Sequence, residues 1–160
     1  MIRQANKNDI PIILEIFKQA RQFMTENGNP SQWNENYPNQ SDIENDIQKR
    51  HAYVAEEKGE IIGVFTLIIG PDESYRHIEK GNWSHDFTYG TIHRLASNGK
   101  VAGFAHQCFD FCYQKIPYLR IDTHKDNAKM LAAIRQYGFN ECGIIHLDDG
   151  SPRIAFDFYQ

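Results

Sequence analysis

A glycine-rich turn between a predicted strand and a predicted helix carries the residues best suited to bind an anionic ligand. Gly99, Gly103 and Ala105 leave little side chain around the first turn of that helix. The first amides of a helix have no partner within it and lie at the positive end of its dipole, so they attract anions. Small residues let a diphosphate approach these amides, and Lys100 adds a positive charge. An ordinary strand-to-helix connection, in which the glycines serve only backbone geometry, stays open as the alternative.

The stretch from Tyr89 to Gln114 must position this turn. Its first part, Tyr89 to Leu95, mixes β-branched and aromatic residues with polar ones, which is typical of a strand. The sequence Ser97-Asn98-Gly99 then favours a turn. Beyond the turn, apolar residues recur with the helical period, so we expect a helix with one buried face. These residues are Val101, Phe104, Ala105, Cys108, Phe109 and Cys112.

Two sets of residues raise the question of a metal site. Cys108 and Cys112 lie four residues apart on the same predicted helix, a spacing that a metal or redox pair can use, but both fall on its apolar face, which favours core packing. Asp122 and His124, together with His93, form the second set. No further ligand pair has metal-site spacing, so we expect no bound metal.

Composition is that of an ordinary folded enzyme or binding domain. The chain has 160 residues, of which 41% are hydrophobic and 24% charged, and we expect one domain, 1–160. Its net charge of −4 argues against nucleic acid or an anionic membrane as a partner. We find no membrane-spanning run and no signal peptide at the N-terminus. Three cysteines without a disulfide framework favour a reducing, cytoplasmic location.

Hydrophobic patterning predicts the element order β-α-α-β-β-β-α-β-α-β-β. This order mixes antiparallel strands with helical crossovers, so the fold class is α/β or α+β with a mixed sheet. The remaining predicted strands are Met1 to Ala5, His51 to Glu56, Glu60 to Ile69, Tyr118 to Ile121, Cys142 to Leu147 and Arg153 to Tyr159. The remaining predicted helices follow Asn8-Asp9, cover Ser41 to Arg50, and run from Asn127 to Gly138.

Local signals fix the expected ends of some elements. Ser41 and Glu44 have the spacing of a helix capping box. Lys58-Gly59 predicts a tight hairpin between two strands. Gly138 predicts a helix C-terminus.

The element order and two motifs together resemble the GCN5-related N-acetyltransferase (GNAT) family. The acetyl-CoA loop of that family has the form Gln/Arg-x-x-Gly-x-Gly/Ala, and the stretch Lys100 to Ala105 follows it with Lys in the first position. The second motif is an Asn followed twelve residues later by the aromatic residue of Gly-Phe, which Asn127 and Gly138-Phe139 match. The resemblance implies a central, mostly antiparallel mixed sheet flanked by about four helices.

The resemblance also implies how acetyl-CoA binds. In such enzymes the central strand splays from its parallel neighbour and pantetheine lies in the gap, here near Leu95 and Ser97. The Leu95 amide would polarise the thioester carbonyl. Asn127 would bind the pantetheine arm or orient its neighbours. A primary amine then attacks the thioester directly, with no covalent enzyme intermediate. The diphosphate would lie on the amides from Val101 through Ala102, Gly103 and Phe104 to Ala105.

The usual general acid of the family is a Tyr seven residues after the Asn, where this chain has Ile134. Tyr137 is near in sequence but lies on another face of the helix. Asp122 and His124, at the end of the neighbouring strand, are nearer the expected thioester. The missing Tyr leaves open a second function, an acyl-CoA-binding or regulatory domain that has lost turnover.

A base must deprotonate the attacking amine, and the central strand offers no carboxylate for it. His93 is the best replacement, because its ordinary pKa is close to the working pH. A histidine that only forms hydrogen bonds within the sheet is the alternative. His85 with Asp86 is the second choice for the base and His124 the third.

The acceptor is not encoded in any motif, but aromatic residues predict the character of its pocket. Trp33 and Tyr37 lie in the long polar loop 27–40, and Trp83 precedes the central strand. We expect these three rings to bind a small-molecule or peptide amine, and the acidic balance favours a cationic one. The terminal strands offer surfaces for a homodimer.

Overall fold

Seven strands form one mixed sheet in the computed structural model, which describes all residues, 1–160. The order across the sheet is β1-β2-β3-β4-β5-β7-β6, and every neighbouring pair is antiparallel except β4 and β5. Both the predicted element order and the predicted sheet type are confirmed. The strands are β1 Ile2–Gln4, β2 Ala52–Glu57, β3 Glu60–Ile69, β4 Gly90–Ser97, β5 Tyr118–Thr123, β6 Asn140–His146 and β7 Pro152–Tyr159.

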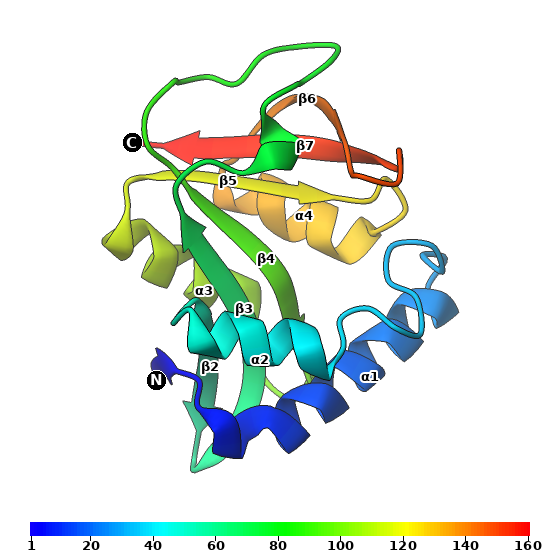
Figure 1. Ribbon diagram of the computed structural model, residues 1–160, viewed down its shortest axis with the longest axis vertical. Helices are drawn as coiled ribbons and strands as arrows, with labels where there is room; N and C mark the ends of the chain where they lie inside the picture. The colour runs from blue at the N-terminus through cyan, green and yellow to red at the C-terminus, as the bar shows by residue number, and fades with distance from the viewer.

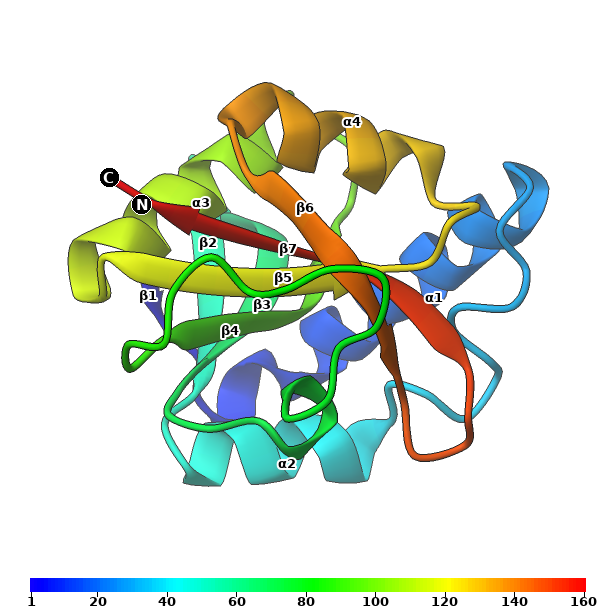
Figure 2. The same ribbon diagram turned by 90° about the horizontal axis from the view of Figure 1, so that it is seen from above.

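Four helices cover the two faces of the sheet, α1 and α2 on one face and α3 and α4 on the other (Figures 1 and 2). They are α1 Ile10–Glu26, α2 Gln40–Gln48, α3 Phe104–Lys115 and α4 Ala128–Tyr137. None of them is both long enough and apolar enough to cross a membrane.

Helix ends follow the local chemistry, with one correction to the predicted caps. Asn127 caps α4 by accepting a hydrogen bond from the Met130 amide, and Gly138 ends that helix in the left-handed conformation, as predicted. The capping box of α2, however, is formed by Asn39 and Asp42, so the predicted pair of Ser41 and Glu44 was wrong. Asn39 adopts extended backbone ahead of the helix, which is the conformation that an N-cap requires.

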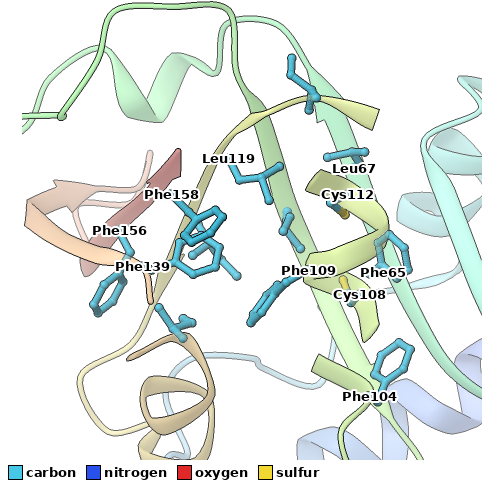
Figure 3. Packing of buried hydrophobic residues seen from close by; sticks show 14 of the residues in the cluster. Phe65, Leu67, Phe104, Cys108, Phe109, Cys112, Leu119, Phe139, Phe156 and Phe158 are labelled. Atoms are coloured by element: carbon cyan, nitrogen blue, oxygen red, sulfur yellow. The ribbon is translucent and has the colours of Figure 1, made fainter. Parts of the chain in front are cut away.

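The larger core lies between the sheet and the helices α3 and α4 (Figure 3). Phe109 of α3 contacts Phe139 edge-on, with ring centroids 5.1 Å apart, and each such ring contributes roughly 1.5–3 kcal/mol by burial. Cys108 and Cys112 are wholly buried in the same cluster, which confirms core packing. A second cluster joins α1 and α2 to the opposite face of β2, β3 and β4.

The polar segment 71–88 passes over the sheet on its way from β3 to β4 (Figure 2). Several interactions attach it to the strands beneath, among them those of Ser84 and Tyr75. The Ser84 amide and hydroxyl both donate to Asp157 of β7, at 2.7 and 2.8 Å. Tyr75, in one turn of 3₁₀ helix, is only 2% exposed and reaches β5. The segment therefore brings side chains from outside the sheet to the ends of β4 and β5.

Candidate active site

The two parallel strands at the centre of the sheet separate almost as soon as they pair. Residues Gly90 and Thr91 of β4 lie opposite Leu119 and Arg120 of β5, and no further pairs follow. The diverging strands are visible in Figure 1. The rest of β4 therefore has no strand partner on its β5 side, and its backbone groups there are free to bind another molecule.

A bulge changes the direction of β4 within this opening. The register against β3 shifts between Val64 and Thr66, which lie opposite Ala96 and His93, and Arg94 between the latter two has a φ of 51°. A non-glycine residue in this left-handed region carries strain, which the surroundings must offset. They do so by fixing the Arg94 side chain, which donates to both carboxylate oxygens of Asp46 at 2.7 Å and to the Tyr37 hydroxyl at 3.0 Å.

The chain beyond β4 forms an open loop before α3, which begins at Phe104 and not at Val101. Gly99 and Gly103 have φ values of 77° and 81°, and a Cβ added at either would meet no atom within 4 Å. Both glycines thus border open space rather than packed protein, next to the free amides at the start of α3. The Lys100 amine forms an exposed ion pair with Glu60 at 2.6 Å.

The side chains of Phe104 and Val101, which the sequence predicted as part of the diphosphate loop, pack in the core. The Phe104 ring is 4% exposed and lies where a side chain at position 63 would be, so Gly63 is needed to admit it. Val101 packs against the same core. Both residues could reach a ligand in the loop only through their backbone.

A pocket of about 600 Å³ lies at the opening between β4 and β5. Segments far apart in the sequence line it: the loop before α2, residues 72–74, the ends of β4 and β5, and the β6–β7 loop. Of the predicted site residues, it includes His93, Leu95, Asp122, Asn127, Trp33 and Tyr37. It does not include His124, Trp83, Ser97 or the loop Lys100 to Ala105.

His93 forms a carboxylate–imidazole pair with Asp72 in this pocket. Its Nε2 lies 2.9 Å from Asp72 Oδ2, and the two side chains are 24% and 19% exposed. Burial alone would raise the pKa of Asp72, but the hydrogen bond and charge of His93 outweigh it and hold that pKa below its ordinary value. Nδ1 of His93 has no hydrogen-bond partner in the protein, which leaves it available to a ligand.

Asp122 forms the second pair, with Tyr75. The Tyr75 hydroxyl donates to Asp122 Oδ2 at 2.6 Å. Burial raises the pKa of Asp122 above its ordinary value, although His93 and the Tyr75 hydrogen bond oppose the change. Burial also raises the pKa of Tyr75, so the phenol stays a donor. A carboxyl group with this environment is suited to receive a cation or a proton.

Asn127 and His124 lie at the far end of β5. While capping α4, Asn127 donates through Nδ2 to Gln32 Oε1 at 3.1 Å, which ties it to the loop before α2. His124 Nδ1 accepts from the Asp126 amide at 3.0 Å, and burial together with the charge of Arg153 lowers its pKa. His124 therefore stays neutral at the rim and does not line the pocket.

The three predicted aromatic residues separate into two groups. The rings of Trp33 and Tyr37 contact each other with centroids 6.3 Å apart, and both line the pocket. Trp83 lies elsewhere, with its ring 4.1 Å from the Arg120 guanidinium and its indole N–H donating to the Tyr75 carbonyl. The position of Trp83 thus indicates a role in packing, and it does not support the predicted contact with substrate.

Known structures share this fold over the whole chain. An acetyltransferase of the GNAT family from Streptococcus agalactiae is 31% identical, with a TM-score of 0.92 over 100% of this chain and 95% of that one. This chain belongs to the GNAT family. No protein-family model and no curated protein sequence matches it.

More distant GNAT-fold structures agree in fold. A putative acetyltransferase from Staphylococcus aureus is 22% identical with a TM-score of 0.73, covering 99% of this chain and 98% of that one. An aminoglycoside acetyltransferase in complex with coenzyme A and kanamycin is 16% identical with a TM-score of 0.66, covering 100% of this chain and 94% of that one. The chain is accordingly an acyltransferase by family, and proteins of the same fold have been solved with coenzyme A and with acetyl-CoA.

The residue at the usual position of the GNAT general acid faces the core. Ile134 is fully buried in the cluster beneath α4. The hydroxyl of Tyr137 donates a hydrogen bond to Asp110 of α3 at 2.7 Å. Burial, and to a smaller extent the Asp110 carboxylate, raises the pKa of Tyr137. Neither residue lines the pocket. His85 stacks on Phe87 and likewise lies outside it.

Several long-range contacts at and beside this GNAT pocket gave no signal in the sequence. Asp72 and Tyr75 lie 21 and 47 residues from the partners that they contact, and Asp46 lies 48 residues from Arg94. No spacing rule connects positions so far apart. The polar composition of the segment 71–88, unexplained by any secondary structure, was the one available hint.

Proposed function

We propose that this protein transfers the acetyl group of acetyl-CoA to a primary amine by direct attack. The observation that carries the proposal is the opening between β4 and β5, with the His93–Asp72 and Asp122–Tyr75 pairs on its two sides. Acyl transfer between two substrates requires a site that holds the thioester and ionisable groups that handle the protons. Here the unpaired backbone of β4 could hold the thioester, and ionisable side chains lie at the opening. Acetyl-CoA supplies the reactive thioester.

The residues fit that cosubstrate. Pantetheine would pair with the β4 backbone at Leu95 and Ser97, and the Leu95 amide would stabilise charge on the carbonyl oxygen. The open space at Gly99 and Gly103 admits the diphosphate to the amides between Val101 and Ala105. The exposed ion pair of Lys100 with Glu60 is a weak one, so its amine is free to turn to a phosphate. Asn127 would contact the pantetheine arm through its side-chain amide.

Proton transfer falls to the two pairs. In the tautomer in which Nε2–H of His93 donates a hydrogen bond to Asp72, Nδ1 carries the lone pair. Nδ1 then acts as the base for the attacking amine. Asp122 would hold the amine as it enters, assisted by its Tyr75 hydrogen bond. The carbon–sulfur bond then breaks, and the thiol of CoA, with an ordinary pKa of about 8.5, leaves as the thiolate without a Tyr acid. His124 would orient the end of β5 rather than exchange protons.

The acceptor enters from the side of Trp33 and Tyr37. Carboxylates of Asp72, Asp122, Asp148 and Asp149 line this pocket and attract an amine. Structural neighbours act on such groups: one is named a ribosomal-protein-alanine N-acetyltransferase and another an aminoglycoside acetyltransferase. All three cysteines are free thiols in the interior, which fits a cytoplasmic enzyme working as a single domain.

The second function, an acyl-CoA-binding domain without turnover, is favoured by one observation. The family's acid position is the buried Ile134, and no tyrosine near it replaces the acid.

Two measurements on the same protein separate these functions. A thermal-shift titration with acetyl-CoA, CoA and a pantetheine fragment tests the donor site, because a ligand of the native state raises Tm by mass action. Release of free CoA is then followed with a panel of primary amines. Stabilisation by both CoA forms with amine-dependent CoA release supports the enzyme, while stabilisation without release supports the binding domain. If neither CoA form shifts Tm at millimolar concentration, both proposals fail.

A further inference from the structure

Arg153 is a buried guanidinium whose charge nothing in the protein neutralises by contact. It is 6% exposed and lines the pocket from the start of β7. Two of its N–H groups donate to main-chain carbonyls, of Pro152 at 2.9 Å and of Gln32 at 3.5 Å. Its other N–H groups have no partner, and no carboxylate lies within 4 Å of it. Burying a charge in this way is costly, so a reason for it is expected.

Other poorly exposed arginines of this chain have partners that stabilise their charge. Arg94, in the same pocket, is held by both oxygens of Asp46. Arg120, the one other arginine that is more than nine-tenths buried, lies over the rings of Trp83 and Tyr89 at 4.1 and 3.9 Å. Arg153 has no carboxylate within ion-pair distance, although Asp122 and Asp149 are near enough to interact with its charge, and it lies over no aromatic ring. Its free donors form the planar fork that binds a carboxylate with two hydrogen bonds.

The position of Arg153 assigns such a carboxylate to the acceptor rather than to the donor. The pocket it lines includes His93, Asp72 and Asp122, whereas the proposed phosphate loop from Lys100 to Ala105 lies outside. Arg153 and Asp122 line the same pocket. An amine at Asp122 and an anionic group at Arg153 can therefore belong to one small molecule.

We propose that the acceptor is an amino acid, whose carboxylate is bound by Arg153 while its amine lies at Asp122 and His93. This inference rests on the proposed function, and it narrows the substrate from amines in general to amines that carry a carboxylate. Arg153 then sets specificity without taking part in proton transfer. The carboxylates of Asp148 and Asp149, which also line the pocket, would repel a second acidic group on the same molecule.

The test compares each protein amino acid with its α-amide, which keeps the amine and removes the negative charge. Wild-type protein, Arg153→Met, Arg153→Lys and a control, Arg76→Met, are assayed for CoA release with both members of each pair. Arg76 is an exposed arginine that contacts Glu73 outside the pocket. Tm of each variant checks folding, and Arg153→Met should not lower it, because it removes an unpaired buried charge.

We expect the preference of wild type for the acid over the amide to fall about 100-fold in Arg153→Met and about 10-fold in Arg153→Lys, which keeps the charge but not the fork. Arg76→Met should retain the wild-type preference. A wild-type enzyme that prefers the amide, or a preference for the acid that survives Arg153→Met, overturns the inference.

Failure of the proposed function can be distinguished from failure of this inference by a binding experiment. If no acceptor releases CoA, wild type and Arg153→Met are titrated calorimetrically with the same amino acids in the presence of CoA. Binding that needs Arg153 supports the carboxylate site even without turnover. Equal binding in both proteins, or none in wild type, overturns it.

Discussion

The proposed donor side and the proposed acceptor side of this protein are built in opposite ways. The donor side is nearly one continuous stretch, from Leu95 to Ala105, and offers mainly backbone groups and open space at two glycines. The acceptor pocket gathers side chains from five separate parts of the chain, held in pairs such as His93 with Asp72. One side depends on the absence of side chains and the other on their identity.

This difference teaches which changes each side tolerates. A backbone site accepts most substitutions but not a Cβ where the chain needs a left-handed glycine. A side-chain site keeps its backbone when a residue is changed and loses its chemistry instead. Substitutions on the donor side should alter affinity for CoA, and substitutions in the pocket should alter rate.

The largest effect is expected at His93. His93→Gln removes the base but keeps a hydrogen bond to Asp72, so kcat should fall about 100- to 1000-fold while KM for acetyl-CoA stays within about 2-fold. Steady-state kinetics with the best amine measures both. His77→Gln is the control, since that histidine is 85% exposed and lies outside the pocket. An unchanged kcat in His93→Gln would remove His93 from the mechanism.

A substitution at Gly103 tests the proposed donor side through affinity for CoA instead of rate. Gly103→Val places a branched side chain in the open loop at a φ of 81°, so Kd for CoA should rise about 30-fold through strain and obstruction of the diphosphate. Calorimetric titration measures it.

Gly59→Val is the matched control for this change. Gly59 has a φ of 77° and the same empty surroundings, but it lies in the β2–β3 hairpin. Both variants should lose similar stability, and only Gly103→Val should lose affinity. Equal affinity of the two variants for CoA would exclude the loop as the diphosphate site.

Asp72 should stabilise the fold in a pH-dependent way. Its pKa is lowered in the folded protein from an ordinary 3.8, so its contribution is present above that value and is lost as pH falls through the folded pKa. Asp72→Asn should therefore lower Tm by about 3 °C, or roughly 1 kcal/mol, at about pH 7, and this loss should disappear once pH falls below the folded pKa of Asp72. Thermal unfolding across pH measures this, and a Tm loss that is the same at every pH would contradict it.

Asp122 should show the smallest effect on stability, with the reverse sign. Its pKa is raised by burial, so the folded state loses stability as pH rises from 3.8 to the folded pKa, and the loss persists above it. Asp122→Asn keeps an acceptor for Tyr75 and removes the buried charge, so Tm should rise by about 1–2 °C at about pH 7 and match wild type in acid. The same variant should lose acetyl transfer. A lower Tm at neutral pH would show that the carboxylate is stabilising.

The sequence by itself determined the order of the elements, the mixed sheet and the glycine-containing loop before α3, whose role in binding the donor stays a prediction. Each of these depends on residues close together in the chain: the periodicity of α3, the Lys58-Gly59 turn, the glycines before Phe104 and the Asn127 cap. Local backbone preferences and hydrophobic period act over a few residues, so they can be read directly. The family resemblance came from the same local motifs.

Only the tertiary structure decided the acceptor side. The pairs of His93 with Asp72, Asp122 with Tyr75 and Arg94 with Asp46 join positions 21 to 48 residues apart. It also placed Trp83 over Arg120 instead of in the pocket and left Arg153 without a counterion. Which side chains meet there depends on the divergence of β4 from β5 and on the path of the segment 71–88, and neither is a property of any short stretch of sequence.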